Sequence, residues 1–144
     1  MGLLLAADLL TLPVRLHDIE LARPVDVVVD LAGRRVLGLE VRCGDEVHRF
    51  LPLPAARVDD GEISIGSPLT MLDELPFYRA RGRTLNSLRG GRVTRGGACL
   101  GTLRDLVFGT DGEIREVVLK TPTGERRVPA GPDLHVAAPL SSPA

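Results

Sequence analysis

The chain has few aromatic residues and only one lysine. Aromatic residues make up 3% of its 144 residues and tryptophan is absent, whereas 44% of the residues are hydrophobic. A chain of this composition buries enough apolar surface to fold, but its core must consist of aliphatic side chains. Lys120 is the only lysine, so arginine supplies nearly all of the positive charge. The net charge of −1 gives the whole molecule no general attraction to polyanions.

Cysteine is also scarce. Neither Cys43 nor Cys99 belongs to a CxxC motif, and no histidine lies near them at a zinc-ligand spacing. This pattern argues against a disulfide framework and against a structural zinc site. We expect two small, partly buried thiols, as is typical of a reducing compartment.

The sequence lacks a long apolar run. No segment approaches the ~20 apolar residues that a membrane-spanning helix needs. The apolar stretch at residues 1–14 has no basic region, is interrupted by Asp8 and is followed by no cleavage site, unlike a secretion signal. A myristoylation motif requires Ser or Thr at the position of Ala6. We therefore expect a soluble cytoplasmic protein.

An internal repeat is the strongest feature that the chain does contain. Between residues 9 and 33, residue n matches residue n + 79 without a gap, and a slip of one residue in a turn continues the match. The identical pairs include Leu9 and Leu88, Val14 and Val93, Leu21 and Leu100, Asp26 and Asp105, Val28 and Val107, and Gly33 and Gly112. Turns accept length changes that strands do not, so the slip is compatible with a duplicated β unit.

Both copies are predicted to form short strands joined by tight turns. The predicted segments are strands at 25–29, 36–42 and 47–51 with a turn at 30–33, and strands at 114–120 and 125–128 with a turn at 109–112. Pro52 and Pro129 end the last strand of each copy, because proline donates no ladder hydrogen bond. No second layer is predicted to cover these strands. We therefore predict an all-β fold of two tandem small β-barrels, since closing a barrel removes exposed edges.

The repeat divides the chain into four parts. They are a first barrel at residues 1–66, a helix-containing linker at 67–84, a second barrel at 85–136 and a disordered tail at 137–144. Residues 67–75 predict one short helix, which Ser67 caps and Pro76 stops. The tail is predicted to be disordered because it shows no periodicity.

A pattern of turn and core residues recurs in both copies. In the second copy it consists of Gly90, Val93, Leu100, Gly101, Asp105, Leu106, Val107, Gly112, Ile114, Val117, Val118, Val128 and Pro129. In the first copy it consists of Val14, Leu21, Asp26, Val27, Val28, Asp30, Gly33, Val36, Leu39, Val41, Phe50, Leu51 and Pro52, with Thr11 and Ala22 in place of two glycines. This pattern resembles the PRC-barrel, in two tandem copies that cover nearly the whole chain. Similar barrels in the photosynthetic reaction centre H subunit and in a ribosome maturation factor look like protein-binding modules, so the resemblance implies a binding role.

No local motif predicts catalysis. His17, His48 and His135 are isolated from one another and from any nucleophile at a recognised spacing. The acidic pairs at 59–60 and 73–74 are best explained as solvated charges in a loop and on a helix. The glycines between 90 and 101 lack the P-loop pattern and predict hairpin turns. We predict that the protein is not an enzyme and holds no cofactor or metal.

The repeated Asp26 and Asp105 allow two interpretations. They are ligand carboxylates that recur in both copies, or they accept backbone N–H groups at a turn or bulge, as short aspartate side chains do well. We favour the second interpretation, because a position that defines the fold needs no ligand to explain it.

The candidate binding residues lie between positions 77 and 95. Phe77 and Tyr78 either fill the seam between the barrels or form an exposed aromatic site for a partner. Residues 79–95 contain no acid and six arginines: Arg79, Arg81, Arg83, Arg89, Arg92 and Arg95. The rest of the chain then carries a net charge of −7, since the whole carries −1. These arginines either pair with that acidic remainder or meet an anionic partner.

The function that we predict is a protein-interaction adaptor of the tandem PRC-barrel type. It would bind either a protein partner or, as a homodimer, a second copy of itself. The alternative is an RNA- or ribosome-associated assembly factor that uses the stretch from Arg79 to Arg95. Against nucleic acid, that stretch has no lysine and no interleaved aromatic residue for stacking on bases.

Overall fold

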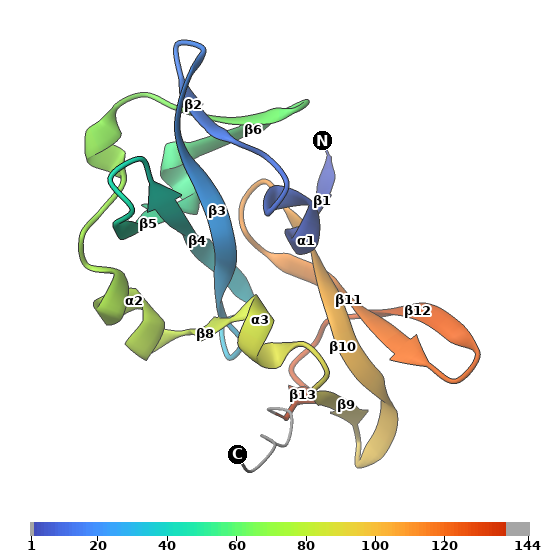
Figure 1. Ribbon diagram of the computed structural model, residues 1–144. Coiled ribbons are helices and arrows are strands. Elements are labelled where there is room, and N and C mark those ends of the chain that lie inside the picture. The colour runs from blue at the N-terminus through green and yellow to red at the C-terminus, as the bar shows by residue number, and fades with distance from the viewer. Residues whose placement is uncertain (1, 138–144) are drawn as a thin grey trace.

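Two curled β-sheets form most of the molecule, as a computed structural model shows (Figure 1). The structure describes residues 2–137. The predicted mostly-β character is confirmed. Within these residues, three short helices accompany the sheets, namely α1 (Ala6–Leu9), α2 (Leu75–Arg81) and α3 (Leu85–Leu88), with single 3₁₀ turns η1 (Leu53–Ala55) and η2 (Pro68–Thr70).

The strands fall into two sheets, which we call the first sheet and the second sheet. The first sheet has the order β5-β4-β3-β2-β7-β6, with β8 paired to β3. Its strands are β2 (Val14–Leu16), β3 (Ile19–Asp30), β4 (Arg35–Cys43), β5 (His48–Pro52), β6 (Ala56–Asp59), β7 (Glu62–Ile65) and β8 (Arg83–Thr84). The second sheet has the order β12-β11-β10-β9-β13, with β1 paired to β10. Its strands are β1 (Leu3–Leu5), β9 (Arg92–Arg95), β10 (Ala98–Gly109), β11 (Ile114–Thr121), β12 (Gly124–Pro129) and β13 (Leu134–Val136).

The long strands β3 and β10 curl their sheets at corresponding points. Each pairs with the strand that follows it, β4 or β11, and each pairing contains two register shifts. The shifts lie between Pro24 and Asp26 and between Val28 and Val29 in β3, and between Leu103 and Asp105 and between Val107 and Phe108 in β10. All four positions in β10 are 79 residues after those in β3. A bulge bends a strand and increases its twist, which explains the curl.

Each sheet includes one strand from the other part of the chain. The N-terminal strand β1 pairs with β10 of the second sheet, where Leu5 lies opposite Val107. Strand β8 pairs with β3 of the first sheet, where Thr84 lies opposite Val28. The two exchanges correspond to each other, because Thr84 lies 79 residues after Leu5 and Val107 lies 79 residues after Val28. The predicted first barrel, residues 1–66, therefore gives its first strand to the other sheet.

Two buried aspartates hold the exchanged segments in place. Asp26 Oδ1 accepts the N–H of the next residue at 2.8 Å and the N–H of Asn86, in α3, at 3.0 Å. Asp105 Oδ1 accepts the N–H of the next residue at 2.8 Å and the N–H of Ala7, in α1, at 2.9 Å. Both aspartates lie beside a bulge, so the predicted role as acceptors of backbone N–H groups is confirmed. The second donor in each case comes from the segment that the sequence assigned to the other half.

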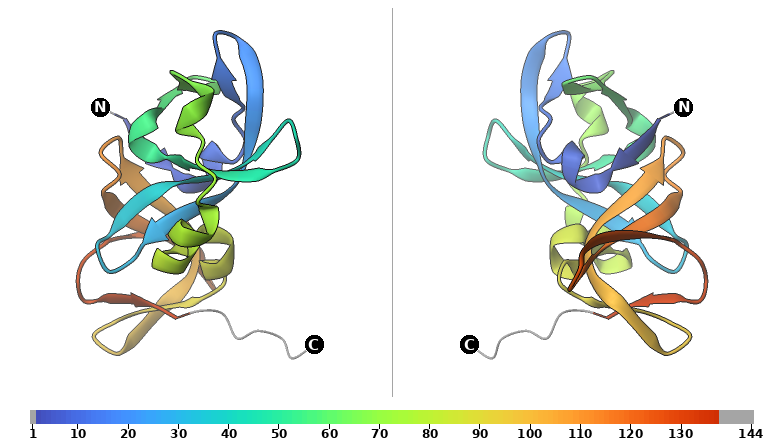
Figure 2. Two further views of the ribbon diagram at one scale, coloured as in Figure 1. Left: turned by 90° about the vertical axis from the view of Figure 1, so that its left-hand side faces the viewer. Right: turned by 90° about the vertical axis from the view of Figure 1, so that its right-hand side faces the viewer.

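A common core fills the space between the sheets. It contains aliphatic residues from both, such as Val27 and Leu39 of the first sheet and Leu106 and Leu119 of the second. The predicted aliphatic core is thus confirmed, with Phe108 as its aromatic member. The opposite side of each sheet, which we call its outer face, is different in the two sheets. Helix α2 lies over the outer face of the first sheet (Figure 2, left), where a second, smaller buried cluster forms.

The predicted helix at residues 67–75 is wrong. Pro68–Thr70 form only a 3₁₀ turn, which Ser67 caps through its side chain, and the α-helix begins at Leu75. Pro76 therefore lies in the first turn of α2 and does not stop a helix. The first turn tolerates proline because its N–H would have no partner there in any case.

Other features also differ from the prediction or lie outside it. The hairpin of β6 and β7 was not predicted, and β7 runs parallel to β2, with Ile63 opposite Val14.

Both cysteines are free, but only Cys43 is buried and Cys99 is exposed. Apart from its first residue, the predicted disordered tail at 137–144 lies outside the described residues. Among residues 2–137, no helix combines the length and the apolar character needed to span a membrane.

Candidate functional site

The two aromatic candidates lie on α2 but differ in their surroundings. The Tyr78 ring stacks on Phe50 of β5 with 3.9 Å between ring centroids, so Tyr78 packs on the outer face of the first sheet. Phe77 is 49% exposed, and the Arg81 guanidinium lies 4.4 Å from its ring centroid. The prediction that both rings fill a seam is wrong, because the core between the sheets contains neither. Phe77 fits the alternative of an exposed aromatic side chain.

Glu40 fastens α2 to the first sheet. It is a buried carboxylate, 2% exposed, on the outer face of β4. Arg79 of α2 donates to it from Nε at 3.1 Å, and Nδ1 of His48 lies 2.5 Å from its other oxygen. Burial raises the pKa of the Glu40 carboxyl, but the hydrogen bonds with His48 and Arg79 outweigh this effect, so the pKa lies below its usual value. The carboxylate is therefore ionised and paired at neutral pH.

The sequence interpretation missed Glu40, although a signal for it was present. In the overlay of the two copies after the turn, Leu39 and Val41 match aliphatic residues of the second copy. Glu40 stands between them and matches Val118. An acid where the other copy has valine predicts a buried polar partner, since an unpaired buried charge is costly.

The other five predicted arginines lie on several elements. Arg81 stacks on Phe77 as described, Arg83 on β8 and Arg92 on β9 are exposed, and Arg95 Nε lies 3.4 Å from Asp133. Pairing with an acid, one of the two predicted roles, is thus found for Arg79 and Arg95. Arg89, which follows α3, lines a pocket that the sequence interpretation did not find.

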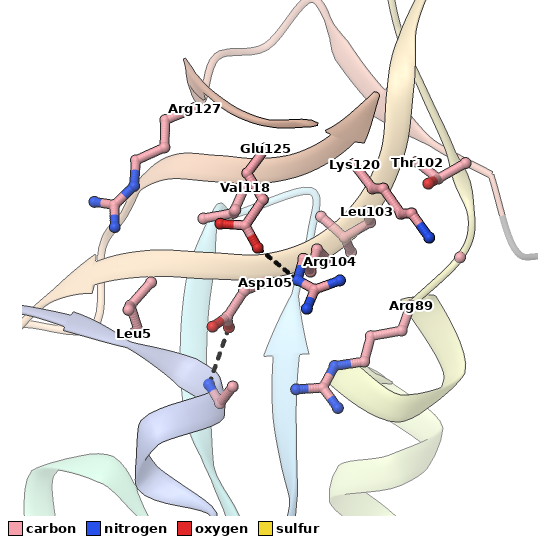
Figure 3. Close-up of a pocket in the computed structure, with 12 residues that line it drawn as sticks. Leu5, Arg89, Thr102, Leu103, Arg104, Asp105, Val118, Lys120, Glu125 and Arg127 are labelled. Atoms are coloured by element: carbon pink, nitrogen blue, oxygen red, sulfur yellow. Dashed lines mark hydrogen bonds and ion pairs between the residues drawn. The ribbon is translucent and has the colours of Figure 1, made fainter. Parts of the chain in front are cut away.

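This pocket lies on the outer face of the second sheet and has a volume of about 520 Å³ (Figure 3). We call it the basic pocket. It is lined by Leu5, Ala7, Arg89, Gly90, Thr102, Leu103, Arg104, Asp105, Val118, Lys120, Glu125 and Arg127. Val118 and Lys120 point to it because they alternate along β11 with Val117 and Leu119, which face the core. Leu5 reaches it through the exchanged strand β1.

The charges in the basic pocket are unevenly paired. Arg104 Nε lies 2.6 Å from Glu125, and Arg127 lies 3.9 Å from Glu116. Within the described part of the chain, Arg89 and Lys120 form no ion pair. Asp105 is already bound to two backbone N–H groups. The pocket therefore presents an excess of positive charge beside apolar side chains.

No protein-family model and no curated protein matches this chain. Its function is therefore inferred from the geometry of the molecule.

The remaining candidates do not converge on a site. His17 lies in the exposed turn between β2 and β3, and His135 lies exposed on β13. Asp59 and Asp60 are exposed at the turn between β6 and β7. Within residues 2–137, no group of three His, Cys, Asp or Glu side chains is arranged to hold a metal ion. The basic pocket, like the cluster around Glu40, brings charged and apolar groups from distant segments together.

Proposed function

We propose that this protein is a non-enzymatic protein-binding adaptor of the tandem PRC-barrel type, which binds its partner at the outer face of the second sheet. The resemblance of the two copies to the PRC-barrel supports the type. The matched bulges in β3 and β10 and the reciprocal exchange of β1 and β8 also support a duplicated unit. Similar barrels look like protein-binding modules, and that analogy motivates the role but does not locate the site.

The observation that carries the proposal is the difference between the two outer faces. On the first sheet, α2 covers Phe50 and Glu40. On the second sheet, the basic pocket occupies the outer face, where α1 contributes only Ala7 to the lining and no helix among the described residues takes the place that α2 has on the first sheet. Basic side chains around an apolar floor favour an acidic and partly apolar partner, because charge complementarity guides association while apolar burial stabilises the complex.

The chemistry of the basic pocket favours binding over catalysis. Its described lining contains no histidine or cysteine. Of its two carboxylates, Asp105 accepts backbone N–H groups and Glu125 pairs with Arg104. A general base needs a carboxylate or imidazole that is available to a substrate proton. Both carboxylates have structural partners.

Affinity capture with matched charge reversals tests this proposal. The test variant carries Lys120→Glu and Arg127→Glu. The control carries Arg42→Glu, at the corresponding position on the outer face of the first sheet, and Arg57→Glu, which is exposed on β6. We expect the captured proteins, quantified by mass spectrometry, to be lost from the test variant and retained by the control.

Two results would contradict the proposal. If both variants retain the same proteins, the outer face of the second sheet is not the binding surface. If nucleic acid is captured and is lost on reversing Arg83 and Arg92, the RNA- or ribosome-associated function is supported, and the binding should then weaken steeply with salt. Homodimer formation stays a prediction, which analytical sedimentation tests. Cytoplasmic location also stays a prediction, which cell fractionation tests.

A further inference from the structure

The two outer faces correspond residue by residue. Asp26 of β3, Glu40 of β4 and Phe50 of β5 lie side by side across the first sheet. Their counterparts across the second sheet are, in the same order, Asp105 of β10, Val118 of β11 and Arg127 of β12. The basic pocket therefore occupies the place on the second sheet that corresponds to Glu40 and Phe50.

On the first sheet, a helix occupies that place. Tyr78 of α2 stacks on Phe50, and Leu75 of α2 is buried in the same cluster. Arg79, one residue after Tyr78, forms the ion pair with Glu40. The short helix thus contributes an apolar contact and a positive charge, and the sheet contributes the negative charge.

On the second sheet, the distribution of charge is reversed. Valine replaces the buried acid, and arginine replaces the phenylalanine, so the positive charges of Arg127 and Lys120 belong to the sheet. Arg89 adds a further cation, and its Nε is buried without a hydrogen-bond partner in the described structure. Leu5 and Val118 provide the apolar part of the lining on the outer face.

We propose that the basic pocket receives a short amphipathic helix from a partner protein, which lies on the second sheet as α2 lies on the first and carries acidic residues where α2 carries arginine. This inference rests on the proposed function and specifies the partner segment. Acidic side chains of the helix meet Lys120, Arg127 and Arg89, and an apolar side chain covers Leu5 and Val118. A helix in a groove is a common mode of peptide recognition, with anchors spaced three and four residues apart.

Other occupants fit the basic pocket less well. Helix α2 of a second copy carries Arg79 and Arg81, which the cations of the pocket would repel. A nucleic acid fits less well because no aromatic side chain lines the pocket to stack on a base.

Fluorescence anisotropy with designed peptides and the full chain tests the inference. The probe is a stapled amphipathic helix with leucines three and four residues apart and glutamates on the flanking positions. Stapling is needed because unconstrained helices shorter than ~12–15 residues are marginal in water. Its controls are the same peptide with lysine for glutamate, an unstapled acidic peptide with a central proline, and a single-stranded RNA oligonucleotide.

We expect the acidic helix to bind about tenfold or more tightly than either peptide control and the RNA. Lys120→Glu and Arg127→Glu should each weaken that binding about tenfold, and Arg42→Glu should leave it unchanged. Circular dichroism verifies that each variant is folded. If Arg127→Glu unfolds the chain, Arg127→Gln together with Lys120→Gln replaces it and should also weaken binding.

Four results would overturn the inference. They are equal binding of the basic helix, equal binding of the proline-containing peptide, tighter binding of the RNA, and a dimer in sedimentation that Lys120→Glu dissociates. If no peptide binds while affinity capture still depends on Lys120 and Arg127, the helical occupant is wrong and the protein-binding function stands. If capture also shows no such dependence, both are wrong.

Discussion

At the scale of single residues, Asp26 and Asp105 each connect two distant parts of the chain. Each carboxylate satisfies two backbone N–H groups, one at its own bulge and one in a helix that comes from the other part of the chain. The side chain therefore fixes the bend of a strand and the position of a helix at the same time. A local turn motif would have required only the first of these bonds.

Replacing Asp26 with alanine tests this dual role. Both N–H donors would lose their acceptor, and a buried N–H without a partner costs about 1–3 kcal/mol. We expect Asp26→Ala to lower the free energy of unfolding by about 3 kcal/mol in urea denaturation. Asp26→Asn keeps an oxygen acceptor, so it should lower the free energy of unfolding clearly less. Asp60→Ala, at an exposed position, should change the free energy of unfolding little. Equal losses for Asp26→Ala and Asp26→Asn would show that the charge matters and not the accepted bonds.

At the scale of elements, α2 shows what local pattern reasoning misses. Pro76 is compatible with the end of one helix and with the start of another, and only the tertiary contacts decide between them. Those contacts are the stacking of Tyr78 on Phe50 and the ion pair of Arg79 with Glu40, both made to strands far away in sequence. The helix therefore begins at a residue that places Tyr78 and Arg79, in its second turn, against Phe50 and Glu40 of the sheet.

The attachment of α2 should depend on pH. The pKa of Glu40 is lower in the folded protein than in the unfolded chain, so its ionised form stabilises the fold above the usual pKa of about 4.5. This stabilisation declines as the pH falls below that value through the lowered pKa. The charged or titratable groups that face Glu40 are His48 on β5, Arg79 on α2 and Asp26 on β3. Acid should thus release α2 from the sheet.

Near-ultraviolet circular dichroism can follow this release, because Tyr78 is the only tyrosine and the chain has no tryptophan. We expect the Tyr78 signal to fall with acidification below about pH 4.5 while the far-ultraviolet signal of the sheets persists. In Glu40→Gln the signal should be weaker at neutral pH and nearly independent of pH over the same range. A wild-type Tyr78 signal that is constant down to the pH where the sheets unfold would contradict this mechanism.

At the scale of the whole molecule, the sequence predicts where the strands lie better than it predicts which strands pair with one another. Strands such as β3, β4 and β11 could be predicted because their aliphatic pattern and flanking turns are local properties of the chain. The pairing of β1 with β10 could not, because three apolar residues at the N-terminus carry no sign of a partner about a hundred residues away. The basic pocket was missed for the same reason. Its cations, Arg89, Arg104, Lys120 and Arg127, come together only through the register of β10, β11 and β12.

The exchange of β1 and β8 makes a prediction about the independence of the two halves. A cut after the exposed Gly66 separates residues 1–66 from residues 67–144 and breaks the chain between β7 and η2. The first fragment then lacks β8 and α3, and the second lacks β1 and α1. Each fragment also exposes its side of the common core.

We expect each fragment alone to be largely unfolded, and an equimolar mixture to regain the sheets of the intact chain. Small domains depend on nearly all of their buried apolar surface, so neither fragment retains enough to fold alone. Far-ultraviolet circular dichroism and amide hydrogen exchange measure the recovery. Introducing Asp105→Ala into the second fragment removes the acceptor for Ala7 and should weaken reassembly by about tenfold or more. Cooperative unfolding of either fragment on its own would instead show two independent units, in which case the exchanged strands contribute little to the stability of either sheet.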